Sequence, residues 1–262
     1  MARVTESNDP NDIDHCDTPE RVWHWMRALG KDPLPPRFEI DGVSYRLVQS
    51  VKHDFMAATG FYEDDAGRRV VLKIGRVASM FGLPLTWIGR FLCRRETRFY
   101  RKLADLPNVP KLIGQVGDTG FVHEYVHGRP LAANKPVPDG FFDQCMELLA
   151  EIHRRGIAYV DTNKPENILL GDDGRPYLID FQISWDFRFL LKRMQREDIY
   201  HILKHKKRLR RDELTHEELH RVTHKSLLIR LHRTAFKPYF LFRRRLFKHL
   251  RESGRVMPEG SK

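Results

Sequence analysis

Alternating apolar and polar residues in the first half of the chain predict a run of short strands. A period of two is the pattern of a sheet with one half-buried face. Polar turns separate the segments, and the sequence DDAG marks the turn before the third of them. The five predicted strands cover residues 45–51, 55–62, 69–74, 111–116 and 121–126.

A different period predicts a helix between the third and fourth strands. Apolar side chains recur at helical spacing over residues 87–106, and Glu96 lies on the same stripe as Leu92 and Phe99. A carboxylate aimed at a core is costly unless a cation meets it. Lys73, in the apolar strand VVLKI, is the expected partner. The sequence therefore predicts an ion pair between Lys73 and Glu96.

Two polar residues flank a predicted hairpin in the second half of the chain. Its apolar strands, residues 168–170 and 177–179, are joined by the turn GDDG, with Asn167 before the first strand. Asp180 follows the second strand, so the hairpin is expected to make Asn167 and Asp180 neighbours. Amide and carboxylate oxygens are ligands that Mg2+ uses together with water and phosphate oxygens. The pattern predicts a Mg2+ site of the kind that phosphoryl transfer requires.

The order of these residues resembles that of the protein-kinase-like superfamily. Residues 164–167 read KPEN, as in the catalytic loop of that family, and Asp180 begins DFQ where the family has DFG. Lys73 matches the lysine of the VAIK strand, and Glu96 matches the helix glutamate that pairs with it. The resemblance spans approximately residues 43–200.

The chain departs from the family at three places. The family has one residue between the catalytic Asp and the Lys of KPEN, whereas Thr162 and Asn163 both follow Asp161 here. Either the loop bulges and Asp161 keeps the role of base, or Thr162 occupies the Asp position and the base is lost. Gln182 replaces the glycine of DFG, and the segment expected over the phosphates has one glycine instead of three. These features are most similar to compact bacterial lipopolysaccharide-core kinases and RIO-type kinases.

The resemblance implies an α+β fold with two lobes. An N-lobe of antiparallel sheet with one key helix is expected over residues 37–126. A mainly helical C-lobe that ends in basic, aromatic helices is expected over residues 127–262, with a core helix at 143–154. Residues 1–36 are expected to form a disordered tail, a short helix at 22–29 and a linker.

The resemblance also implies a nucleotide site for ATP. Lys73, held by Glu96, would pair with the α and β phosphates. Backbone groups of the hinge between the lobes, at Glu124, Tyr125 and Val126, would bind the adenine edge.

The implied reaction moves the γ-phosphoryl group of ATP to a hydroxyl. Asn167 and Asp180 would hold Mg2+, Lys164 would neutralise the moving group, and Asp161 would orient the acceptor hydroxyl and take its proton. The acceptor would be a protein Ser or Thr, or a sugar hydroxyl of a lipopolysaccharide core. The alternative is a nucleotide-binding pseudokinase that acts as an interaction module.

Basic residues concentrate toward the C-terminus. The formal net charge is +11, and the residues from Phe181 onward contain 22 Lys and Arg against 9 Asp and Glu. Residues 232–251 interleave basic and aromatic side chains, which predicts either a closing helix with a solvated basic face or peripheral contact with an anionic membrane surface. A glycolipid acceptor would fit the second case. Nucleic-acid binding through this stretch is a further alternative.

No segment of the sequence predicts a membrane span. Residues 80–91 are apolar but short and interrupted by glycine and proline, so they are expected to pack before the helix, with a membrane-facing loop as the alternative. Residues 1–17 lack the apolar run of a secretory signal. Cys16, Cys93 and Cys145 are too widely spaced to predict a zinc site or disulfides. A cytoplasmic location, peripheral on the inner face of the membrane in the lipid-binding case, is therefore expected.

Overall fold

The computed structural model describes residues 24–80, 82–132 and 135–223. The predicted tail before residue 24 and the basic, aromatic stretch 232–251 lie outside these residues. The membrane and nucleic-acid contacts expected of that stretch therefore stay predictions. Among the described residues, no helix combines the length and the apolar character needed to cross a bilayer.

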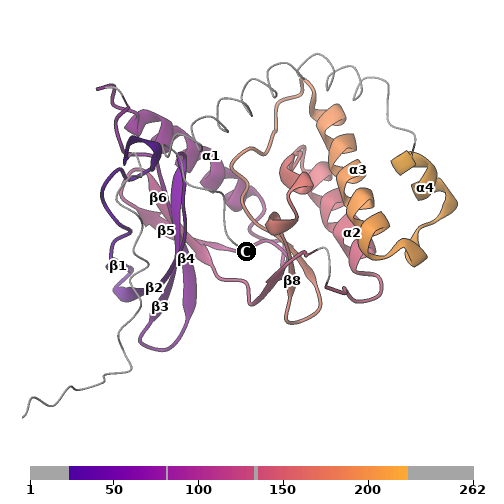
Figure 1. Ribbon diagram of the computed structural model, residues 1–262, viewed down its shortest axis with the longest axis horizontal. Coiled ribbons are helices and arrows are strands. Elements are labelled where there is room, and N and C mark those ends of the chain that lie inside the picture. Colours follow the sequence, from indigo (N-terminus) through magenta and orange to yellow (C-terminus); the bar gives the residue numbers. More distant parts are fainter. Residues whose placement is uncertain (1–23, 81, 133–134, 224–262) are drawn as a thin grey trace, which may run out of the picture. The chain divides into compact units, whose positions relative to one another are not determined.

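The first lobe is built on a six-stranded antiparallel sheet in the order β1-β2-β3-β4-β6-β5 (Figure 1). Its strands alternate as the sequence predicts: every second residue of β3 is buried, and the residues between are mostly half-buried. The strands are β1 (Arg37–Ile40), β2 (Val43–His53), β3 (Ala57–Asp64), β4 (Arg69–Gly75), β5 (Leu112–Val116) and β6 (Gly120–Glu124).

A single long helix, α1 (Thr86–Lys102), packs against this sheet (Figure 1). The approach of α1 to the end of β4 is close because Gly89 has no side chain: a Cβ there would lie 2.2 Å from the carbonyl oxygen of Arg76. The buried face of α1 includes Glu96, Phe99 and Tyr100. Helix α1 is thereby fixed next to the strand that contains Lys73.

The second lobe is mainly helical and contains a small three-stranded sheet in the order β7-β8-β9. Buried aromatic and aliphatic side chains of α2 pack with Tyr159, Phe181 and Ile202 in one cluster that also includes Phe99 and Phe121 of the first lobe. Buried Lys206 bonds the carboxylates of Asp143 and Glu218, at 2.8 and 3.2 Å, and so joins three helices. The elements are β7 (Gly128–Pro130), α2 (Phe141–Arg154), η2 (Asp161–Asn163), η3 (Pro165–Asn167), β8 (Ile168–Gly171), β9 (Pro176–Leu178), α3 (Leu191–Leu209), η4 (Arg211–Glu213) and α4 (His216–Thr223).

The structure differs from the sequence-based expectation at the start of the described chain. Instead of a helix over residues 22–29, the described part has one 3-10 turn, η1 (His24–Met26). The expected linker, residues 33–36, also packs on the sheet, since Leu34 is buried in a cluster with Leu29 and Ala58. Strand β1 was not expected, because four residues are too few to establish a period.

Candidate active site

Lys73 lies on β4 and bonds two carboxylates that come from different lobes. Its ammonium is 2.9 Å from the carboxylate of Glu96 on α1 and 2.8 Å from Oδ1 of Asp180. The Lys73 side chain is 12% exposed and that of Glu96 is 2% exposed. The apolar stripe predicted for α1 thus aims Glu96 inward, and Lys73 meets it there.

Burial and ion pairing act in opposite directions at this site. Burial raises the pKa of Glu96 to about 7, although the Lys73 ammonium opposes that shift. Burial alone would lower the pKa of Lys73, but the two carboxylates outweigh it and raise the pKa. Burial alone would raise the pKa of Asp180, and Lys73 outweighs it so that the pKa is lowered. Lys73 therefore stays a cation and Asp180 an anion at neutral pH.

The hairpin of β8 and β9 brings Asn167 and Asp180 together, as the sequence predicts. The strands pair antiparallel with Ile168 opposite Leu178, and the amide of Ile179 donates to the carbonyl of Asn167 at 3.1 Å. Asp180 then turns away from the ladder with a φ of 62°. Its amide donates to the hydroxyl of Tyr100 on α1 at 3.3 Å, which ties the turn to the first lobe.

Asp161 belongs to the same group of polar side chains. Its Oδ2 accepts from the ammonium of Lys164 at 2.7 Å and from the side-chain amide of Asn167 at 2.9 Å. Thr162 points elsewhere: it is fully buried and its hydroxyl donates to Asp198 at 3.1 Å. The extra residue before KPEN is therefore taken up in the 3-10 turn η2, and Asp161 is the residue that faces Lys164 and Asn167.

Asp198 on α3 holds this loop from behind, and sequence reasoning missed it. Its carboxylate accepts from the main-chain amides of Tyr159 and Val160, each at 2.8 Å, and its side chain is 1% exposed. Val160 has a φ of 74°, which is a rare conformation for a β-branched residue. Such a conformation is kept only where its surroundings fix it. Asp198 lies 31 positions after KPEN in a basic helix, and the sequence pattern of that helix does not mark Asp198 as inward-facing.

One face of the sheet gathers further polar groups around Lys73. Thr59 lies opposite Lys73, and Lys52 lies opposite Thr59, so the three residues form a row across β2, β3 and β4. His123 lies opposite Val71 and hence on the Lys73 face of the sheet. Burial lowers the pKa of His123 to about 4, so the ring is neutral at pH 7.

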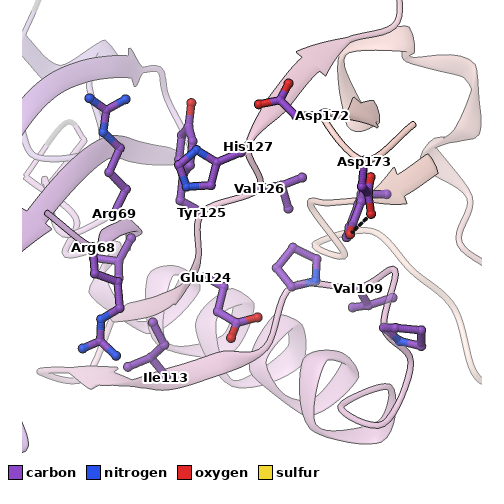
Figure 2. A pocket seen from close by; sticks show the side chains of 14 residues that line it. Arg68, Arg69, Val109, Ile113, Glu124, Tyr125, Val126, His127, Asp172 and Asp173 are labelled. Atoms are coloured by element: carbon purple, nitrogen blue, oxygen red, sulfur yellow. Dashed lines mark hydrogen bonds between the residues drawn. The ribbon is translucent and has the colours of Figure 1, made fainter. Parts of the chain in front are cut away.

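The hinge residues Glu124, Tyr125 and Val126 line a cavity of about 500 Å³ (Figure 2). The rest of its wall comes from β4, the segment before β5 and the β8–β9 turn, and it includes neither Lys73 nor the polar residues around it. The amide of Glu124 donates to the carbonyl of Lys111. Among the described residues, the amide and carbonyl of Val126 have no hydrogen-bond partner. Adenine binding by this segment stays a prediction.

The donor set at Asn167 and Asp180 fits a magnesium ion. Asn167 bonds Asp161 through its amide nitrogen, which leaves its amide oxygen as a ligand, and Asp180 bonds Lys73 through Oδ1, which leaves Oδ2. Both are hard oxygen donors, and Mg2+ commonly takes one or two such protein ligands together with substrate phosphates. Within the described ranges, no three or more His, Cys, Asp or Glu side chains group together as a metal-binding cluster.

Comparisons with known proteins show which sequences and folds this chain resembles. No protein-family model matches the chain. A curated protein, the probable serine/threonine-protein kinase pknA2 of Bifidobacterium longum (strain NCC 2705), is 30% identical over 157 residues. The match covers 53% of this chain and 20% of pknA2, so the chain spans about a fifth of the length of this relative.

Solved structures show the likeness at the level of the fold. Rio2 kinase from Chaetomium thermophilum, in its ADP/Mg2+-phosphoaspartate complex, superimposes with a TM-score of 0.53 and 18% identity over 64% of this chain and 57% of that one. The BubR1 kinase domain gives 0.51 and 14% over 68% of this chain and 66% of that one. The chain therefore has the two-lobed, α+β fold of protein kinases. The predicted fold class and the resemblance to the protein-kinase-like superfamily are confirmed at this level.

Proposed function

We propose that the chain is a phosphotransferase that uses ATP and Mg2+ to phosphorylate a hydroxyl group. One observation carries the proposal: Lys73 contacts both Glu96 and Asp180, at 2.9 and 2.8 Å, in a chain with the protein-kinase-like fold. The fold alone does not require three ionisable groups at this position, because apolar residues would fill the same volume without the desolvation penalty of buried charges. Binding of a nucleoside triphosphate would account for the three charged groups.

Each residue has a proposed task in the transfer. Lys73, oriented by Glu96, binds the α and β phosphates, and hinge backbone groups at Tyr125 and Val126 hold the adenine. Magnesium, held by Asn167 and Asp180, supplies positive charge that neutralises the phosphate oxygens. These contacts fix the triphosphate so that its γ-phosphoryl group faces the catalytic loop.

The second group of residues acts on the acceptor and on the moving phosphoryl group. Asp161 accepts the proton of the incoming hydroxyl through its carboxylate. Lys164, 2.7 Å from Asp161, balances the negative charge that spreads over the γ-phosphoryl oxygens. The O–Pγ bond to the acceptor forms as the bond from Pγ to the ADP oxygen breaks.

The proposed acceptor is a protein Ser or Thr hydroxyl or a sugar hydroxyl of a lipopolysaccharide core. The likeness to pknA2, a probable serine/threonine-protein kinase, supports the protein acceptor. Assays with a generic protein substrate and with lipopolysaccharide would separate the two hydroxyl sources.

The test is ATP turnover by the purified full chain with Mg2+. Asp180→Ala is expected to abolish turnover, and Asp161→Asn is expected to lower it by about 10²- to 10⁴-fold, the usual value of a general base. Thr162→Val is the matched control, because Thr162 lies in the same loop as Asp161. This substitution removes one hydrogen bond to Asp198 on α3 and should keep most of the turnover rate. Turnover that persists in Asp180→Ala would contradict the proposal. Nucleotide binding without turnover in the native chain would instead indicate a pseudokinase.

A further inference from the structure

Helix α1 has a second organised face, directly opposite the face that presents Glu96. Trp87, Phe91, Arg94, Arg98 and Arg101 follow one another at steps of four, three, four and three, which places them on one stripe. At 100° per residue, Glu96 is half a turn away from Trp87. The stripe is therefore the outer surface of the helix that orients Lys73.

The first end of this outer face is apolar and open. Trp87 is 64% exposed and Phe91 is 57% exposed, although such side chains are on average largely buried in folded proteins. Leu83, just before the helix, is also 64% exposed. Its turn is closed by two backbone hydrogen bonds with Met80, so Leu83 is held in a defined place next to the helix start. Among the described apolar residues of 80–91, which were expected to pack before the helix, Leu85 is buried and Met80 and Ile88 are half-buried.

The other end of the outer face is strongly basic. Helix α1 contains six Lys and Arg, and its one acidic residue, Glu96, is buried on the inner side. Arg98 and Lys102 share Asp186, and Arg90 pairs with Asp118. Arg94 and Arg101 are exposed and have no ion pair within the described part of the chain. The stripe thus joins two protruding aromatic side chains, with Leu83 next to them, to at least two uncompensated cations.

We propose that this outer face of α1 binds an anionic lipid bilayer. Leu83, Trp87 and Phe91 would enter the boundary between headgroups and acyl chains, where amphipathic aromatic rings are favoured. Arg94 and Arg101 would contact acidic headgroups. Exposed aromatic and aliphatic side chains beside arginines that are unpaired among the described residues combine the two contributions, apolar insertion and attraction to acidic headgroups, by which interfacial segments bind anionic lipid, which favours a bilayer as the occupant.

Membrane contact at this face has a consequence for the nucleotide site. The same rigid helix holds Glu96 at 2.9 Å from Lys73, so lipid that fixes α1 also fixes the orientation of Lys73. Bilayer binding is then expected to raise the affinity for nucleotide. This coupling rests on the proposed function, whereas the binding itself does not.

The test is sedimentation of the full chain with vesicles of phosphatidylcholine, with or without about one third of phosphatidylglycerol. We expect binding to the anionic vesicles that weakens as salt is added. Arg94→Gln with Arg101→Gln should weaken it by about 25-fold, since each cation near an anionic surface contributes about fivefold. Trp87→Ser with Phe91→Ser should also weaken it. The matched controls, Arg37→Gln with Arg46→Gln and Val48→Ser with Val51→Ser, change exposed residues of β1 and β2 and should bind as the native chain does.

A second measurement locates the contact without loss of binding. Lipids brominated in their acyl chains quench tryptophan on contact, so Trp87→Phe should retain vesicle binding and lose most of the quenching. Vesicle binding that is equal in the native chain and in both α1 variants would overturn the proposal and assign binding to the basic stretch 232–251. Quenching that is unchanged in Trp87→Phe would also overturn it. So would an absence of vesicle binding, and capture by polyglutamate in that case would indicate an acidic protein partner.

Discussion

Asp198 offers the sharpest test of how the loop of residues 159–167, which contains Asp161 and Asn167, is held in place. Its Oδ1 accepts from the amide of Val160 and the hydroxyl of Thr162, and its Oδ2 accepts from the amide of Tyr159 and the ring of His153. Asp198→Asn keeps the size of the side chain but converts one acceptor into a donor. In either orientation of the new asparagine side chain, its NH2 group replaces one carboxylate oxygen. One main-chain N–H and one side-chain donor then lose their acceptor.

The size of the effect follows from burial. A hydrogen bond to a charged group contributes about 1.5 to 3 kcal/mol, and a buried donor left without an acceptor costs a similar amount. The Asp198 side chain is 1% exposed, so water does not replace the lost acceptor. Two such losses give about 3 to 5 kcal/mol, which corresponds to roughly 10 °C in melting temperature for a chain of this length.

The assay is thermal unfolding of the full chain, followed by circular dichroism at one pH and one protein concentration. Asp186→Asn is the control: Asp186 also accepts from two cations, Arg98 and Lys102, but both of these are exposed. Its effect should stay below about 1 kcal/mol. If both variants melted at the same temperature, Asp198 would not be the residue that anchors the loop.

Three further outcomes are expected. Burial raises the pKa of Glu96 to about 7, whereas the Glu96 carboxyl of the unfolded chain titrates near 4.5. The native protein therefore holds the carboxyl proton that the unfolded chain has released, and the contribution of Glu96 to the free energy of unfolding falls as pH rises from 4.5 through 7. Glu96→Gln should flatten the plot of melting temperature against pH over that interval, and an unchanged slope would refute the assignment. Gly89→Ala should lower the unfolding free energy by more than about 2 kcal/mol, measured by urea denaturation, since its Cβ would meet a backbone oxygen at 2.2 Å. Lys206→Met should cost about 2 kcal/mol and speed hydrogen exchange in α4, because it removes the cation that joins three helices; exchange equal to the native chain would contradict this.

The sequence predicts contacts well where one local rule determines them. Helical spacing alone places Glu96 on the inner side of α1, and the cost of a buried carboxylate names Lys73 as its partner. A tight hairpin likewise makes its flanks neighbours, so Asn167 and Asp180 converge. In both cases a short stretch of chain and one physical requirement are sufficient.

Contacts that depend on the arrangement of distant elements could not be found in this way. Asp198 reaches Tyr159 and Val160 across 39 and 38 positions, and only the packing of α3 against the loop brings them together. The position of Thr162 depends on the same packing, because its hydroxyl turns toward Asp198. His123 joins the Lys73 face through strand register, which a single strand does not reveal.

The backbone of Val160 has a consequence for how the proposed active site responds to heating. A φ of 74° stores strain in the residue directly before Asp161, and the carboxylate of an α3 residue keeps it there. When α3 loosens, Val160 can relax to an ordinary conformation and rotate its neighbour out of the site. The proposed ATP turnover should then be lost at a lower temperature than that at which the large apolar core melts. Protein warmed to between these temperatures would keep its circular dichroism spectrum and lose turnover.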